Sequence, residues 1–155
     1  MVNTSLIYIE KDGAYLMMHR IKKQNDVNKD KWIGVGGHFE DNEGPYDCAR
    51  REALEETGLT LGPSLKLRAV VTFIIEDGEC NHMFLFTCSD FTGELKSSAD
   101  CREGTLEWVP KSKIYDLDLW EGDLIFLRKI ESECDFFTLK LIYDKDGNLI
   151  GSEMD

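Results

Sequence analysis

Three glutamates, Glu52, Glu55 and Glu56, have the spacing in this sequence that most directly suggests chemistry. In a helix, side chains three and four positions apart share one face, so the three carboxylates would form one acidic patch. Clustered carboxylate oxygens are hard ligands of the kind that Mg²⁺ and Mn²⁺ prefer. The pattern predicts a divalent-metal site. An ordinary solvated acidic helix face is the alternative that the spacing alone leaves open.

The segment that carries these glutamates has clear helix boundaries. Pro45 stands at a favourable first helical position and Gly58 at a typical helix stop, which predicts a helix over residues 45–57. The acidic patch then lies near the carboxyl end of the helix, where the helix dipole disfavours negative charge. Arg51 can pair with Glu55 four positions later, but it cannot neutralise three carboxylates. Clustered like charges at the unfavourable end of a helix, without enough cations to neutralise them, point to a functional site.

The glutamates belong to a longer motif. Gly37 is followed after five residues by Glu43, and after seven more by Arg51, Glu52, Ala53, Leu54, Glu55, Glu56, Thr57, Gly58 and Leu59. This spacing resembles the Nudix box, and only Ala53 departs mildly, because a larger aliphatic residue is usual there. The resemblance implies a metal-dependent hydrolase that cleaves a diphosphate linkage in a nucleotide-like substrate. It also implies that Glu43 and Arg51 pair and brace the preceding loop against the helix.

The Nudix resemblance also assigns metal ligands. It implies that Glu52 and Glu56 are the main ligands, with Glu55 as a further ligand or a water-mediated contact. A backbone carbonyl of Gly36 or Gly37 would join them, because glycine has no side chain to block the approach of a metal. The implied cofactor is Mg²⁺, with Mn²⁺ as the alternative, and its role would be to polarise phosphates and activate water.

The resemblance extends beyond the box to the MutT-type branch, whose members include oxidised-purine nucleoside triphosphate diphosphatases (8-oxo-dGTPases). It rests on Trp32, Gly34, Gly36, Gly37, Trp108 and residues 120–123. The resemblance implies that Phe73, Trp120 and Asp123 surround a nucleobase, with aromatic stacking and a carboxyl at the base edge. Without it, Phe73 and Trp120 would be read as core residues. Two departures, Ile33 for an asparagine and Gly122 for an aspartate, weaken the inference to an 8-oxoguanine base.

Further charged residues outside the box have implied roles. Aligned through Trp108, Glu103 falls near the metals and is a candidate general base or additional metal ligand, while a solvated loop acid is the alternative. Arg20, Lys22 and Lys23 follow a predicted strand at the edge of the presumed cleft, where they could contact phosphates. Exposed surface cations are the alternative for all three.

The fold expected from the hydrophobic pattern is α+β, with a mixed sheet. Short runs of strand formers predict strands over residues 6–10, 14–19, 67–75, 82–88, 105–109 and 136–143. A second helix is predicted over residues 121–132, and a turn over residues 144–147. Together with the Nudix resemblance, these elements predict an α/β/α sandwich with a catalytic loop and helix, formed as a single domain over residues 1–155.

The composition restricts the classes of molecule that the protein is expected to bind. With 30 acidic and 18 basic side chains the net charge is −12, which argues against a nucleic-acid polymer as partner and favours a small-molecule nucleotide bridged by cations. Five cysteines without a CxxC pair fit reduced thiols better than disulfides or zinc. No apolar run reaches membrane-spanning length, so a cytoplasmic protein without a membrane partner is expected. The oligomeric state stays open.

The activity expected from these observations is hydrolysis of a nucleoside triphosphate to the monophosphate and pyrophosphate, with 8-oxo-dGTP or another oxidised purine deoxynucleotide as a candidate substrate. Within the same class, ADP-ribose or a dinucleoside polyphosphate is the alternative, because the box does not separate these substrates. A noncatalytic nucleotide sensor is an alternative from another class. The complete set of glutamates argues against that last reading.

Overall fold

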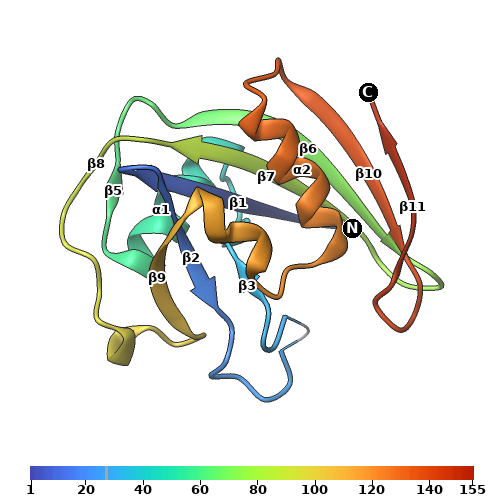
Figure 1. Cartoon of the computed structure of the whole chain (residues 1–155), viewed down its shortest axis with the longest axis horizontal. Helices are drawn as coiled ribbons and strands as arrows, with labels where there is room; N and C mark the ends of the chain where they lie inside the picture. The colour runs from blue at the N-terminus through green and yellow to red at the C-terminus, as the bar shows by residue number, and fades with distance from the viewer. Residues whose placement is uncertain (27) are drawn as a thin grey trace.

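The structure, a computed structural model, describes residues 1–26 and 28–155 (Figure 1). The strands of its larger sheet are β1 Val2–Lys11, β2 Ala14–His19, β3 Trp32–Ile33, β4 Val35–His38, β6 Lys66–Ile75, β7 Cys80–Cys88, β9 Thr105–Pro110, β10 Phe137–Tyr143 and β11 Leu149–Met154. Their order is β11-β10-β6-β7-β1-β2-β3, with β4 also paired to β1 and β9 to β2. A small second sheet joins β5 (Thr60–Leu61) to β8 (Phe91–Thr92).

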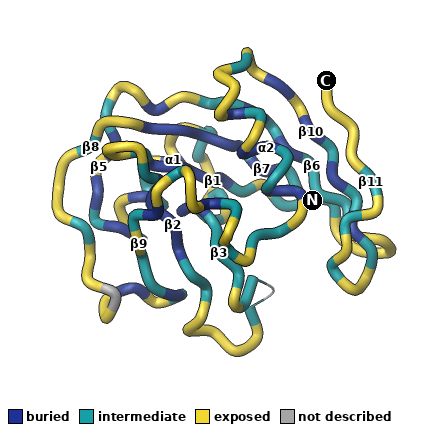
Figure 2. Tube along the Cα trace, in the orientation of Figure 1, coloured by how far each residue is buried: buried dark blue, intermediate teal, exposed yellow. Residues whose placement is uncertain are grey.

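Strand β1 lies inside the larger sheet and borders both hydrophobic cores. It pairs in parallel with β7 and antiparallel with β2 and β4. Because neighbouring side chains of a strand point to opposite faces, Leu6 and Tyr8 enter one core while Ile7 and Ile9 enter the other. All four side chains are buried, as expected for a strand covered on both faces (Figure 2).

Helix α1 (Pro45–Thr57) covers one face of the sheet and matches the predicted range. Its first turn is capped by Asp47, whose carboxylate accepts a hydrogen bond from the Gly44 amide at 2.9 Å. It ends at Gly58, which takes the left-handed conformation with φ 82°. Ala49 and Ala53 are fully buried against the core that contains Ile7 and Ile9, so the small residue at position 53 lets the helix approach the sheet closely.

Helix α2 (Glu121–Glu131) covers the opposite face, where Phe126, Leu127 and Ile130 pack into the core that contains Tyr8. The two helices therefore enclose the sheet, and the predicted α+β fold with α/β/α layers is confirmed (Figure 1). Two short 3₁₀ helices, η1 (Ser98–Asp100) and η2 (Lys111–Asp116), lie in the connections before and after β9.

The observed elements differ from the predicted ones mainly at their ends. β1 begins at Val2 rather than at residue 6, because the backbone of these mixed residues pairs with β7 from Asn81 onward. The predictions for β6, β7, β9, β10 and α2 were off by one or two residues at an end. The short strands β3, β4, β5 and β8 were not predicted, and neither was β11. Strand β11 is a largely exposed edge strand, so it lacks the apolar alternation that marks a half-buried strand (Figure 2).

The helices formed by the described residues include none that is long and apolar enough to cross a membrane.

Candidate active site

A hollow of about 720 Å³ opens beside the helix that carries the glutamates. The residues predicted for the site that line it are Arg20, Lys23, Gly37, Arg51, Glu52, Glu55, Glu56, Phe73, Glu103, Trp120 and Asp123. The fold thus brings together residues from both ends of the chain, with carboxylates in one part of the hollow and aromatic side chains in another. Glu43 and Lys22 are not among the residues that line the hollow. Lys22 instead donates a hydrogen bond to the carbonyl of Cys101 at 2.8 Å.

Strand β4 brings its glycines against the glutamates of α1. The Gly36 amide donates a hydrogen bond to Glu56 Oε2 at 3.1 Å. A Cβ at Gly37 would lie 2.6 Å from the carboxyl carbon of Glu52, closer than such contacts occur. A side chain at position 37 would therefore push the Glu52 carboxylate aside, whereas glycine leaves the Gly37 backbone beside that carboxylate.

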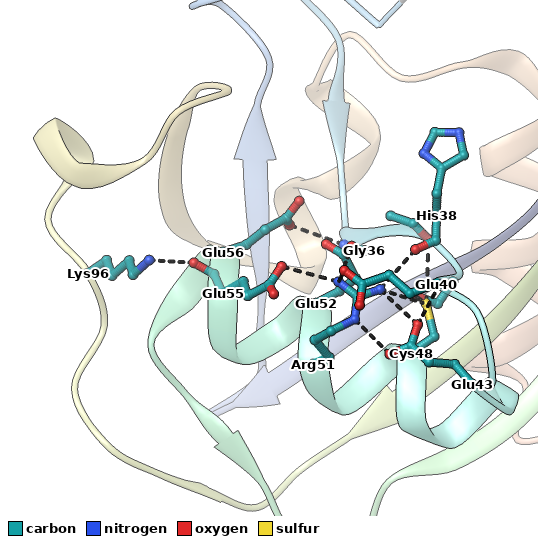
Figure 3. Close-up of polar contacts among 12 residues, drawn as sticks. Gly36, His38, Glu40, Glu43, Cys48, Arg51, Glu52, Glu55, Glu56 and Lys96 are labelled. Atoms are coloured by element: carbon teal, nitrogen blue, oxygen red, sulfur yellow. Dashed lines mark hydrogen bonds and ion pairs between the residues drawn. The ribbon is translucent and has the colours of Figure 1, made fainter.

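Arg51 organises the exposed side of this cluster (Figure 3). Its guanidinium forms a bidentate pair with Glu43, with Nε to Oε2 at 2.6 Å and Nη2 to Oε1 at 2.9 Å. Nη1 contacts Glu52 Oε1 at 2.9 Å and Glu55 Oε2 at 3.2 Å, and Nη2 also donates to the carbonyl of His38 at 2.9 Å. Hydrogen bonding to Arg51 lowers the pKa of Glu43. The Glu43–Arg51 pair therefore links the loop after β4 to the glutamates of α1.

The buried carboxylates carry unfavourable charge. Burial raises the pKa of Glu56 well above its ordinary value, and the negative charge of Glu103 adds to this, while the Gly36 hydrogen bond acts in the opposite direction. Burial also raises the pKa of Glu52, against the lowering effect of Arg51. Arg20 reaches Glu103 at 3.1 Å and Lys23 reaches it at 3.4 Å. Buried carboxylates that repel one another would gain from a bound cation.

These residues fit a divalent cation by their chemistry, since hard oxygen donors, raised carboxyl pKa values and an open glycine backbone meet at one place. Within residues 1–26 and 28–155, however, no three acidic, histidine or cysteine side chains converge as a ready-made ligand set. The nearby cations Arg51, Arg20 and Lys23 pair with the carboxylates instead. The predicted ligand set of Gly37, Glu52, Glu55, Glu56 and Glu103 thus stays a prediction.

Asp123 and Trp120 form the other part of the hollow. Only 3% of Asp123 is exposed, and burial raises its carboxyl pKa to about 7, although the positive charge of Lys31 opposes the shift. Lys31 also lies 5.0 Å from the centre of the Trp120 ring, and Tyr143 packs against that ring edge-on at 5.8 Å. Phe73 reaches Tyr143 with ring centres 6.3 Å apart. A flat ligand in this part would meet aromatic rings and a carboxyl that titrates near neutrality.

The glycine at position 122 has a packing explanation. A Cβ there would lie 2.5 Å from both Leu141 Cδ1 and the Tyr143 hydroxyl, and the Gly122 amide donates to that hydroxyl at 2.9 Å. A side chain at this position would therefore require the Leu141 and Tyr143 side chains of β10 to shift. Ile33, the other departure, lines the hollow with an apolar side chain.

The hollow also contains residues that the sequence did not single out. They include Asn28, Asn81, Met83 and Tyr143. Asn28 lies in a polar stretch without periodicity, Asn81 lies just before a predicted strand, and Met83 and Tyr143 lie within predicted strands. In a single sequence, nothing marks such residues as pocket residues. A second hollow, of about 550 Å³, lies beside the same glutamates and is lined by Lys96 and Arg102 among others.

Comparison with known proteins assigns the family. The family model of the NUDIX domain matches residues 1–130. The chain belongs to the Nudix family. The interpretation of the motif as a Nudix box is thereby confirmed.

Relatives of this Nudix chain agree with the assignment. An uncharacterised Nudix hydrolase, YvcI of Bacillus subtilis, is 37% identical over 99 residues, which cover 59% of this chain and 59% of that protein. An oxidized purine nucleoside triphosphate hydrolase of Danio rerio is 29% identical over 79% of this chain and 74% of that protein. The crystal structure of a mutator MutT protein from Bacillus halodurans superimposes with a TM-score of 0.87 over 100% of this chain and 98% of the other, at 21% identity. The last likeness shows the fold.

Proposed function

We propose that the protein hydrolyses a nucleoside triphosphate to the monophosphate and pyrophosphate in a reaction that depends on Mg²⁺ or Mn²⁺. The observation that carries the proposal is the hollow itself, because one space joins the carboxylates of α1 to aromatic side chains and the buried Asp123. A phosphate chain at the carboxylates and a base at Trp120 would occupy both parts at once. The name of the zebrafish relative supports oxidised purine nucleotides as the substrate class.

Each group then has a physical task. A bound cation would polarise the phosphates and help to generate the attacking hydroxide, and Glu52 and Glu56 would hold it, with Glu55, Glu103 and the Gly37 carbonyl as further donors. Arg51 and Glu43 would position the ligands. Arg20 and Lys23 would bind phosphate oxygens, and these contacts would partly replace their ion pairs with Glu103.

The reaction balances with water as the only other reactant. The oxygen of water forms a new bond to the α or the β phosphorus, the bond from that phosphorus to the oxygen bridging the two breaks, and the bridging oxygen leaves with the other fragment, so that either attack gives the monophosphate and pyrophosphate. The water proton passes to a base, for which Glu103 is the proposed group because it lies beside the buried Glu56. Asp123 would bond the edge of the base, and Phe73 and Trp120 would contact its faces.

The second hollow favours one other candidate within this class. It lies beside Glu52 and Glu56 and has room for a group attached beyond the phosphates, which Lys96 and Arg102 could contact although most of the charged side chains around it are acidic. A dinucleoside polyphosphate or a nucleoside diphosphate linked to a sugar would use such a space.

A panel of nucleotides separates these candidates. Purified protein with Mg²⁺ is given 8-oxo-dGTP, dGTP, dATP, ADP-ribose and a dinucleoside polyphosphate, and the products are identified by chromatography. The proposal expects pyrophosphate and a monophosphate from a purine triphosphate, with the highest kcat/KM on that class. Turnover on ADP-ribose or the dinucleotide alone would replace the proposed substrate. Binding without turnover at any Mg²⁺ or Mn²⁺ concentration would support a nucleotide sensor instead.

A further inference from the structure

Asn28 is a polar residue of the hollow that lies outside the motif. It belongs to the loop between β2 and β3 and lines the hollow together with Trp120 and Asp123. Its backbone is held on both sides, since its amide donates to Asp26 Oδ1 at 3.0 Å and its carbonyl accepts from the Lys31 amide at 2.9 Å. Asn28 is thus held in place although it lies in a loop.

The side-chain amide of Asn28 has a defined orientation. Its oxygen accepts a hydrogen bond from the indole Nε1 of Trp120 at 2.8 Å. Because the indole is only a donor, the oxygen and not the amino group must face Trp120. Among residues 1–26 and 28–155, no acceptor lies within hydrogen-bonding distance of the Asn28 amino group. The amino group is therefore available to a ligand in the hollow.

The residues that line the hollow around Asn28 help this donor to select among ligands. Ile33, Phe73 and Met83 present apolar surface, which offers no competing acceptor. Asp123 lines the same part of the hollow and can accept a hydrogen bond from the edge of a base. Asn28 therefore adds an oriented donor beside the carboxyl of Asp123.

We propose that Asn28 determines base specificity by donating its amino hydrogen to a carbonyl oxygen on the base, so that 6-oxopurines are preferred to 6-aminopurines. The edge of a 6-oxopurine has an acceptor at O6 beside a donor at N1, so O6 can take the donor of Asn28 and N1 can donate to the carboxyl of Asp123. Adenine has an amino group at position 6 and would leave the Asn28 amino group unpaired. The inference rests on the proposed function and adds the substrate class.

Three variants test the donor. Asn28→Asp keeps an oxygen that can accept from Trp120 but removes the amino group, whereas Asn28→Ala removes both. Asn25→Asp introduces the same charge in the same loop at an exposed residue that does not line the hollow, and it serves as the control. The measured quantity is the ratio of kcat/KM for dITP to that for dATP, because these bases differ at position 6 and N1 while effects on the phosphates cancel.

The wild-type ratio should favour dITP, and Asn28→Asp should lower it about tenfold or more, as expected when a buried hydrogen bond is lost. Asn25→Asp should leave the ratio unchanged. An unchanged ratio in Asn28→Asp, even with a change in Asn28→Ala, would mean that Asn28 only supports Trp120, and the inference would be overturned.

A binding arm separates this inference from the proposed reaction. Affinities for dIMP and dAMP are measured by calorimetry in the same variants without added metal. If no triphosphate is hydrolysed but dIMP binds more tightly than dAMP in a manner that depends on Asn28, the proposed reaction fails and the specificity inference stands. Equal affinities for the two monophosphates, or no binding of either, would overturn the inference itself.

Discussion

The buried carboxyl of Asp123 should make the stability of the protein depend on pH, and Asp123→Asn should remove that dependence. Asp123 is 97% buried, and its pKa rises from 3.8 to about 7 in the folded protein. The folded state therefore binds a proton more tightly than the unfolded state does. The stability associated with this proton is present below pH 4, declines between pH 4 and pH 7, and is lost above pH 7.

The size of the effect follows from the shift. One pKa unit corresponds to about 1.4 kcal/mol, so a rise from 3.8 to about 7 corresponds to at most about 4 kcal/mol of destabilisation by the ionised Asp123 at pH 8. Asparagine has almost the same shape and stays neutral. We therefore expect Asp123→Asn to be within about 1 kcal/mol of the wild type near pH 4.5 and about 2–4 kcal/mol more stable at pH 8.

The assay is urea unfolding at several pH values between 4.5 and 8 in the presence of a chelator, so that bound metal does not contribute to the folded state. Asp41→Asn, at an exposed residue, corrects for the loss of one negative charge from an acidic protein. The difference between Asp123→Asn and the wild type should grow with pH. If the difference is the same at pH 5 and pH 8, Asp123 does not titrate in a buried environment and the reasoning is wrong.

Three further predictions concern the carboxylates and the packing of α2. Glu56→Gln should lower kcat by orders of magnitude at saturating Mg²⁺ and leave chelated protein at neutral pH at least as stable as the wild type, because a buried charge beside Glu103 is removed; wild-type turnover would exclude Glu56 as a ligand. Glu103→Gln should lower kcat and change its pH profile if Glu103 is the base, and an unchanged profile would direct attention to another acid. Gly122→Ala should destabilise the protein by about 1–3 kcal/mol in urea unfolding because its Cβ would meet Leu141 and the Tyr143 hydroxyl at 2.5 Å, and a variant as stable as the wild type would contradict the packing explanation.

The elements around the Nudix box were predictable because their signals are local. Pro45 and Gly58 mark the ends of α1 by backbone chemistry that acts within a few residues, and the structure has the helix at the same bounds. The Glu43–Arg51 pair was expected from the family resemblance and is present as a bidentate contact. Local signals of this kind need no knowledge of the tertiary fold.

The features that escaped prediction depend on partners far away in the sequence. β11 is defined by its pairing with β10, and its exposed side chains leave no apolar pattern. Asn28 faces the hollow because Trp120, distant in the chain, donates to it. The close packing at Gly122 is set by Leu141 and Tyr143 on β10. One sequence without its tertiary contacts carries no signal for any of these three.

Because β1 lies between the two cores and pairs with β4, the register of β1 determines both how the cores pack and where the glycines of the site lie. Leu6 pairs with Gly36 and Ser5 pairs with Gly37, while the same strand sends Leu6 and Ile7 to opposite cores. A shift of β1 by one residue would exchange the contents of both cores and move the two glycines away from the glutamates of α1. Single-residue insertions within β1 should therefore abolish folding and activity together, whereas insertions at residues 20–31 should spare the fold, and a screen that scores solubility and turnover separately would distinguish the two classes.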